Sequence, residues 1–168
     1  MALQKNVGLV PAVGAPGQQV VIGQAVYLAF NPLSDGTAKA GAFCFGVAGS
    51  GNGEVFAHAS ATGKANQAVL GFVERVVDSF IPDVLDAATA VYPVGAPLTV
   101  AIRGQFYINA PAAVSGDGLK VWVTPTTGAI RIGDAESGSS EVDTGWVCRI
   151  PNGGASAAEG DVVIVERF

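Results

Sequence analysis

Charged side chains are scarce in this sequence. Asp, Glu, Lys and Arg make up 14% of its 168 residues, against about a quarter in an average soluble domain. The net charge is −5 and the basic residues form no cluster, so binding to nucleic acid through its phosphates is not expected. A surface with so few charges is expected to be partly covered in an assembly.

Residues with reactive side chains are equally few. His58 is the single histidine, and no neighbouring residue type suits it to act as a base. Cys44 and Cys148 both have apolar neighbours, which predicts buried free thiols, and a disulfide would require their strands to meet. The spacing of these three residues fits no zinc site. The sequence therefore predicts no catalytic residue, no cofactor and no metal, and we expect a protein that is not an enzyme.

Long hydrophobic runs are absent too. No segment approaches the roughly 18–20 apolar residues of a membrane span, so no membrane partner is expected. Lys5 is not followed by the uninterrupted apolar stretch of a secretory signal. We expect synthesis in the cytoplasm.

The chain is organised around residues 93–124. Hydrophobic residues and a glycine occupy every second position of its first part, namely Leu98, Val100, Ile102, Gly104, Phe106 and Ile108. This alternation predicts a long strand with one buried face. Gly104 lies at the middle of that face, where a glycine permits a sharp bend. A turn at residues 110–118 leads to a returning strand that begins near Leu119.

Short segments with strand character, separated by Gly- and Pro-rich turns, make up most of the remaining chain: residues 20–30, 42–48, 68–77, 130–132, 145–150 and 162–165. Such spacing predicts an all-β fold, either an antiparallel β-barrel or a jelly-roll-like sandwich with long Gly-rich loops. Residues 68–77 are apolar on both faces, as in a central strand. We expect one β domain over residues 20–168.

Three segments carry more specific predictions. In residues 20–30, one face of the expected strand collects five apolar side chains: Val20, Ile22, Val26, Leu28 and Phe30. Residues 78–92 are the one helix candidate, which Pro82 restricts to a short stretch. Residues 134–143 read as an exposed acidic loop.

The N-terminal residues 1–19 lack a sustained period but contain large aliphatic side chains, among them Leu3, Val7, Leu9 and Val10. Two interpretations stay open: a frayed end, or an extended arm that becomes ordered on a neighbouring protein. On the second interpretation these four residues are candidate protein contacts.

Two aromatic residues are further candidate contacts. Tyr107 and Trp122 alternate with core positions and therefore face away from the core. Exposed aromatic residues on one sheet face are typical of a protein interface; a sugar-binding platform is the rival interpretation. Trp146, beside Cys148, is expected to pack in the core.

Several segments together resemble the capsid cement, or decoration, proteins of tailed bacteriophages. They are GFVER at residues 71–75, PVGAPLTVAIRGQFYI at 93–108, GDGLKVWV at 116–123, GAI at 128–130, DTGWV at 143–147 and GDVVIVERF at 160–168. The resemblance covers about residues 20–168, and none of these segments is a catalytic signature.

This resemblance implies a β-rich, non-enzymatic virion protein on the outer surface of an icosahedral head. The implied partners are the major capsid protein and further copies of the chain, as a dimer at two-fold sites or, alternatively, a trimer at three-fold sites. Two other functions stay open: another structural virion domain, from a tail or baseplate, and a carbohydrate-binding β-sandwich.

Overall fold

The fold is built from β-strands. The computed structural model describes residues 14–46, 55–56, 69–76, 91–137 and 141–168. Within them lie nine strands: β1 (Val26–Tyr27), β2 (Phe43–Gly46), β3 (Val55–Phe56), β4 (Val69–Val73), β5 (Val100–Asn109), β6 (Lys120–Val123), β7 (Ile130–Ile132), β8 (Val142–Arg149) and β9 (Val162–Arg167). A short 3₁₀ turn, η2, spans Pro151–Gly153. None of the described residues forms a helix that could span a membrane.

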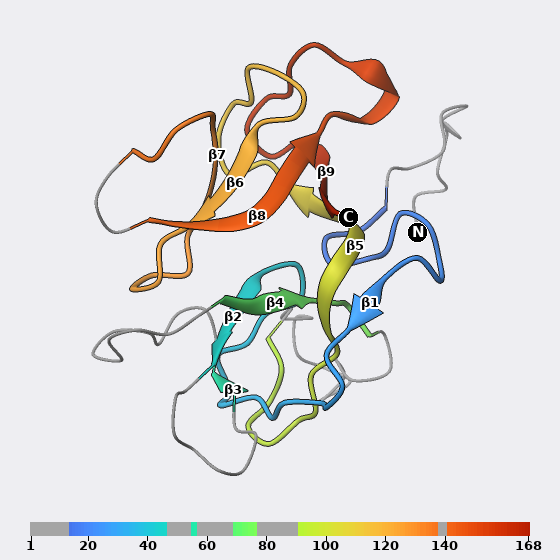
Figure 1. Ribbon diagram of the computed structural model, residues 1–168, viewed down its shortest axis with the longest axis vertical. Helices are drawn as coiled ribbons and strands as arrows, with labels where there is room; N and C mark the ends of the chain where they lie inside the picture. The colour runs from blue at the N-terminus through green and yellow to red at the C-terminus, as the bar shows by residue number, and fades with distance from the viewer. Residues whose placement is uncertain (1–13, 47–54, 57–68, 77–90, 138–140) are drawn as a thin grey trace, which may run out of the picture.

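Every strand pairing is antiparallel. The strand order is β3-β2-β4-β5-β9-β8-β6-β7, and β1 pairs with β5 beside this path. The sheet curls, so that β1–β4 form one half of the molecule and β6–β9 the other (Figure 1). The all-β prediction, with a barrel- or sandwich-like arrangement, is confirmed.

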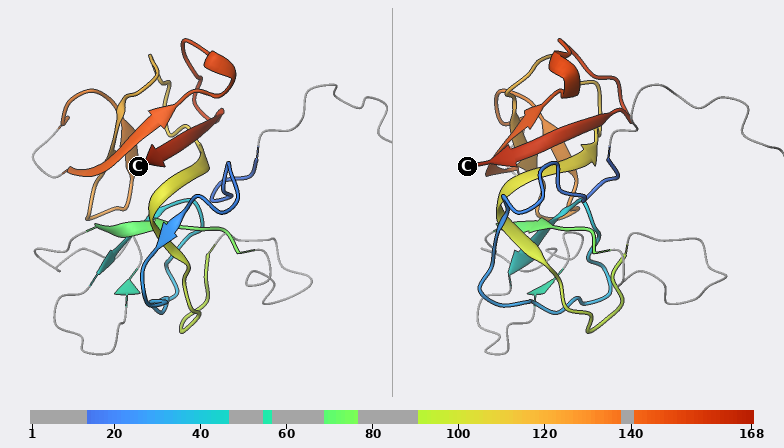
Figure 2. Two further views of the ribbon diagram at one scale, coloured as in Figure 1. Left: turned by 45° about the vertical axis from the view of Figure 1, so that its right-hand side comes forward. Right: turned by 90° about the vertical axis from the view of Figure 1, so that its right-hand side faces the viewer.

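Strand β5 joins the two halves and bends between them. Ala101 pairs with Phe72 of β4, whereas residues from Gly104 onward pair with β9. The ribbon of β5 therefore passes from the lower group of strands into the upper one (Figure 2). Gly104 has φ +136, and a Cβ there would lie 3.0 Å from the Cβ of Ala25. The bend predicted at Gly104 is confirmed, because only glycine combines this backbone angle with this close approach.

The larger core lies between the two halves and is rich in aromatic rings. Phe72 is central, with its ring centroid 5.4 Å from that of Phe43, 5.0 Å from Phe106 and 5.7 Å from Trp146. These four side chains are buried, and they come from both halves of the curled sheet. Trp146 thus packs in the core as predicted.

A second, smaller core covers the other face of β2 and β4. It contains Cys44, Val73, Tyr92 and Leu98. Strand β4 is therefore buried on both faces, which explains why its sequence shows no alternation. Cys44 lies in this smaller core and Cys148 in the larger one, and both thiols are buried and free, as predicted.

The predicted strand over residues 20–30 is wrong for most of its length. Only Val26 and Tyr27 form a strand, and the expected inward residues Ile22, Val26 and Phe30 are exposed. The reason is a turn at residues 22–23, where Gly23 has φ +86. The turn breaks the alternation, and the chain beyond it lies at the margin of β5, where only Ala25, Tyr27 and Leu28 pack against the cores among the described residues of this segment.

Other expectations need smaller corrections. Ala101, expected to face water, is buried, because the start of β5 lies between the two cores: Val100 packs in the smaller one and Ala101 in the larger one. Ile102 is partly exposed. The last part of the expected acidic loop belongs to β8, which begins at Val142. Of the expected helix over 78–92, residues 78–90 lie outside the described residues; Val91 forms a β-bridge with Lys39.

Candidate functional site

The predicted contact residues fall into two groups. Leu3, Val7, Leu9 and Val10 lie outside the described residues. Tyr107 and Trp122 lie on the outward face of the C-terminal half, but β9 and β8 stand between their strands. At about 4.8 Å per strand, β5 and β6 are roughly 14 Å apart, and the pairing register also offsets the two residues along the strands. They do not form one aromatic patch.

Tyr107 is half-buried beneath the segment that precedes β1. The Gly17 N–H donates to the Tyr107 carbonyl at 2.8 Å, and the Tyr107 N–H donates to the Gln18 carbonyl at 3.0 Å. A Cβ at Gly14 would clash with the Tyr107 ring. Residues 14–18 therefore follow the margin of β5 and cover part of the ring.

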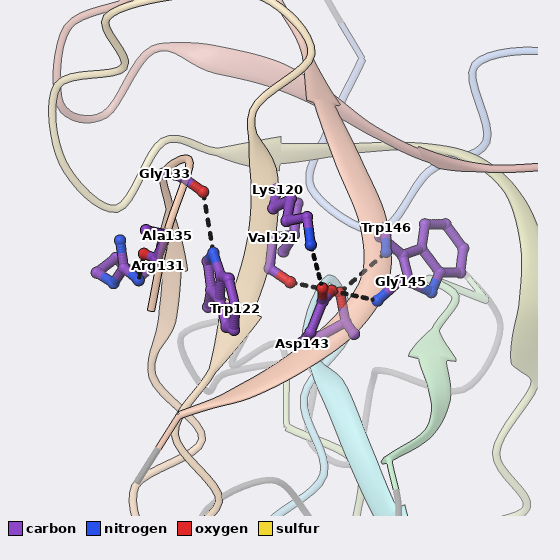
Figure 3. A network of polar contacts seen from close by, with 10 residues as sticks. Lys120, Val121, Trp122, Arg131, Gly133, Ala135, Asp143, Gly145 and Trp146 are labelled. Atoms are coloured by element: carbon purple, nitrogen blue, oxygen red, sulfur yellow. Dashed lines mark hydrogen bonds and ion pairs between the residues drawn. The ribbon is translucent and has the colours of Figure 1, made fainter. Parts of the chain in front are cut away.

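Trp122 is not the exposed aromatic residue that the sequence predicts, since only 9% of it is accessible. It lies outside both cores, and neighbouring polar groups cover it. Its ring N–H donates to the Gly133 carbonyl at 2.9 Å. The Lys120 ammonium and the Arg131 guanidinium lie 5.5 and 5.8 Å from the ring centroid (Figure 3), within cation–π range.

Both cations over Trp122 are held by carboxylates. The Lys120 ammonium lies 2.8 Å from Asp143, and Arg131 forms a two-pronged pair with Glu141 at 2.7 and 2.6 Å. The hydrogen bond from Arg131, helped by the Ser137 N–H, lowers the pKa of Glu141 to about 2. Glu141 and Asp143 are thus tied to the sheet rather than parts of a free acidic loop.

A second polar network crosses β5, β9 and β8. Arg149 lies 2.6 Å from Glu166 and 2.8 Å from Asp117. Gln105 donates to the other oxygen of Glu166 at 2.8 Å. The Ile150 N–H, followed by Arg149, lowers the pKa of Asp117. The ion pairs on the outward face of the C-terminal half therefore form between residues of that half.

Exposed hydrophobic side chains gather elsewhere, in the N-terminal half. Eight large hydrophobic residues are exposed among the described ones, and six of them form what we call the apolar strip: Val21, Ile22, Val26, Phe30, Leu33 and Val94. Ile22 and Val94 are the most open, at 92% and 78%. Sequence reasoning missed the strip, although Gly23 and Gln24 interrupt the alternation there.

Backbone pairing connects the members of the strip. Val26 is in register with Arg103 of β5. Leu33 forms a bridge with Pro97, three residues after Val94. The chain from β1 onward thus runs antiparallel to the beginning of β5 and to the residues before it, so the strip follows one margin of the N-terminal half.

The segment that enters the strip is fastened at Gln19. Its side-chain amide donates to the Glu74 carboxylate at 2.7 Å and also to the Tyr27 hydroxyl. Burial, and then the neighbouring Glu74, raise the pKa of Tyr27. The Val20 N–H donates to the Gln105 carbonyl at 2.9 Å. The described residues that lead into the strip are therefore held against β5.

Comparison with protein families gives one result that covers almost the entire sequence. The family model of the phage structural cement protein (E217 gp24/Pam3 gp6) matches residues 3–167. The chain belongs to this family of phage structural cement proteins. It is therefore a capsid component of a bacteriophage particle and binds the capsid shell. No curated protein matches the chain.

The fold of this cement protein has a counterpart among solved structures. A chain in the capsid of Myoviridae Phage XM1 superposes with a TM-score of 0.65. The match covers 99% of the cement protein and 97% of the other chain, at 14% sequence identity. At this identity the likeness concerns the fold.

Both thiols of the cement protein are buried away from solvent. Burial raises the pKa of the Cys44 thiol to about 12 and that of Cys148 to about 11. Across the described ranges, no group of three or more His, Cys, Asp or Glu could hold a metal ion. His58 lies outside those ranges. Among the described residues, the candidate binding surfaces are thus the outward face of the C-terminal half, which we call the charge-paired face, and the apolar strip.

Proposed function

We propose that this protein acts as a non-catalytic clamp on the outside of an icosahedral head, where it binds across the seams between major capsid protein subunits. The observation that carries the proposal is the family match over residues 3–167. The curled all-β fold with its covered thiols supports a structural role.

The physical basis is linkage between binding and assembly. A protein that binds only the assembled shell makes separation of the subunits more costly. At a free concentration 100 times its dissociation constant, each site adds about 2.7 kcal/mol. Many copies on one head, each touching more than one subunit, strengthen the shell further.

Two finer features belong to the same proposal. Copies associate on the shell as dimers at two-fold sites, with trimers at three-fold sites as the alternative. Residues 1–13 reach over a neighbouring subunit through side chains such as Leu3 and Leu9. The apolar content of this segment supports the second feature, and so does the pairing of the residues that follow it, Gly17 and Gln18, with β5.

The test adds purified protein to expanded heads assembled without it and measures saturable binding and the temperature of head disruption by calorimetry. Binding that saturates at a fixed number of copies per subunit and raises that temperature is expected. Heads that do not bind the protein, or that bind it without gaining heat resistance, would refute the clamp.

Removal of residues 1–13 tests the arm separately. Gly17 and Gln18 pair with β5, so the deletion should stop at residue 13 to spare the fold. Weaker head binding with an unchanged unfolding midpoint is expected. Equal binding by the truncated protein would mean that this segment makes no contact that matters.

A further inference from the structure

The segments that hold the apolar strip carry far fewer charges than the C-terminal half. Residues 110–168 contain eight acidic and four basic side chains. Residues 14–46 and 91–109, which hold the apolar strip, contain only Asp35, Lys39 and Arg103. An exposed margin this apolar, on a protein whose other face is rich in charge, marks a surface that is covered in the assembled state.

We propose that the apolar strip is the face with which the cement protein docks on the head, packed against an apolar surface of a major capsid protein subunit. This inference rests on the proposed function and adds to it the contact surface. Ile22, Phe30 and Val94 are its most exposed members and supply the central contacts.

The path of the chain indicates that the shell is the occupant. Residues 14–20 run along β5 and lead directly into Val21 and Ile22. The thirteen residues before them span at most about 45 Å when extended. The candidate contacts Leu3, Val7, Leu9 and Val10 thus closely precede the strip in the sequence. A shell subunit that binds the strip is therefore a partner that these side chains can also contact.

A second copy of the chain fits the strip less well. Strand β1 has only two residues and its register with β5 shifts between them, so this margin offers no regular edge for strand-to-strand pairing between copies. Contact through side chains against a preformed apolar surface needs no such edge. We therefore assign the strip to the shell.

The chemistry of the strip also predicts how binding responds to salt. Three charged residues in residues 14–46 and 91–109 leave little for salt to screen. Head binding should therefore persist at about 1 M salt, where the Debye length is about 3 Å. An interface made by the charge-paired face would weaken strongly under the same conditions.

Serine substitutions in the full-length protein test the assignment. Val94→Ser should weaken binding to heads assembled without the cement protein by about fivefold, and a triple variant (Ile22→Ser, Phe30→Ser, Val94→Ser) by about 100-fold or more. Val142→Ser, which removes an exposed valine from β8, is the matched control and should bind like the unchanged protein. Urea unfolding of each variant checks that the fold is kept; if the triple variant does not fold, Val94→Ser and Ile22→Ser decide.

The outcomes separate the inference from the proposed function. If the unchanged protein binds heads and the strip variants bind equally well, the strip is not the docking face, and the proposed function is unaffected. If the unchanged protein does not bind, the clamp itself fails. If the variants lose self-association in sedimentation but keep their head affinity, the strip is an interface between copies, which also overturns the assignment.

Discussion

The outward face of the C-terminal half and the apolar strip differ in whether their side chains have partners within the chain. On the outward face, Lys120, Arg131 and Arg149 each have a carboxylate partner, and Trp122 lies beneath two of these cations. On the strip, large side chains such as Ile22 meet only solvent. The side chains of the first surface find their partners within one chain, whereas those of the strip are, on our proposal, covered by a partner protein.

This difference teaches that low overall charge conceals an uneven distribution. Many charges lie where they pair with one another on the C-terminal half, and the two segments that hold the strip, residues 14–46 and 91–109, contain only three. An aromatic residue in a polar surface, such as Trp122, is therefore a poor guide to a contact site, because its neighbours can cover it. The docking proposal therefore rests on the exposed aliphatic residues beside the short, irregular strand β1.

A substitution at the bend of β5, which joins the two halves, should have the largest effect on stability. Gly104→Ala introduces a Cβ 3.0 Å from Ala25 and Phe106 at φ +136, and should lower the free energy of unfolding by about 2–3 kcal/mol. Urea unfolding measures the change. Gly116→Ala is the control, because a Cβ there meets nothing within 4 Å; equal stability of the two variants would show that β5 does not need its glycine bend.

Opening the charge-paired face should have a smaller effect. Arg149→Met leaves the buried Glu166 carboxylate with Gln105 as its remaining side-chain partner, and should cost about 1 kcal/mol because Arg149 is half exposed. Head binding should not change, since this face is complete in the free protein. Lys39→Met, at an exposed lysine with no ion pair to a described residue, is the stability control. A loss of head affinity with Arg149→Met would make this face an interface.

The smallest effect concerns pH. The pKa of Glu141 is lowered from its ordinary 4.5 to about 2 by Arg131. Its contribution to stability is therefore fully present above about pH 4.5 and is lost as the pH falls through about 2. Glu141→Gln should reduce the drop in melting temperature between pH 6 and pH 2, measured by calorimetry. Glu159→Gln, at an exposed loop position, should leave that drop unchanged. If both variants changed the drop equally, the ion pair between Glu141 and Arg131 would not be the cause of the pH response.

The strands that the sequence predicts best are those whose burial depends on local pattern. The alternation around Phe106 and Ile108 places both in the core, and the bend at Gly104 follows from a glycine on an inward face. The same reasoning fails for residues 20–30. There a turn at residues 22–23 interrupts the pattern, and whether Ile22 or Phe30 meets a core depends on segments far away in the sequence.

The sequence by itself determined the all-β class, the bend in β5, the buried thiols and the family, because alternation, glycine placement and residue identity act over short distances. Only the tertiary structure decided which surfaces are closed. Trp122 is covered since β6 and β7 bring Lys120 and Arg131 to its ring. The apolar strip is open since none of the described strands packs over the margin that β1 forms with β5. The exposure of a side chain depends on which residues lie beside it in space, and a periodic sequence pattern does not identify those neighbours.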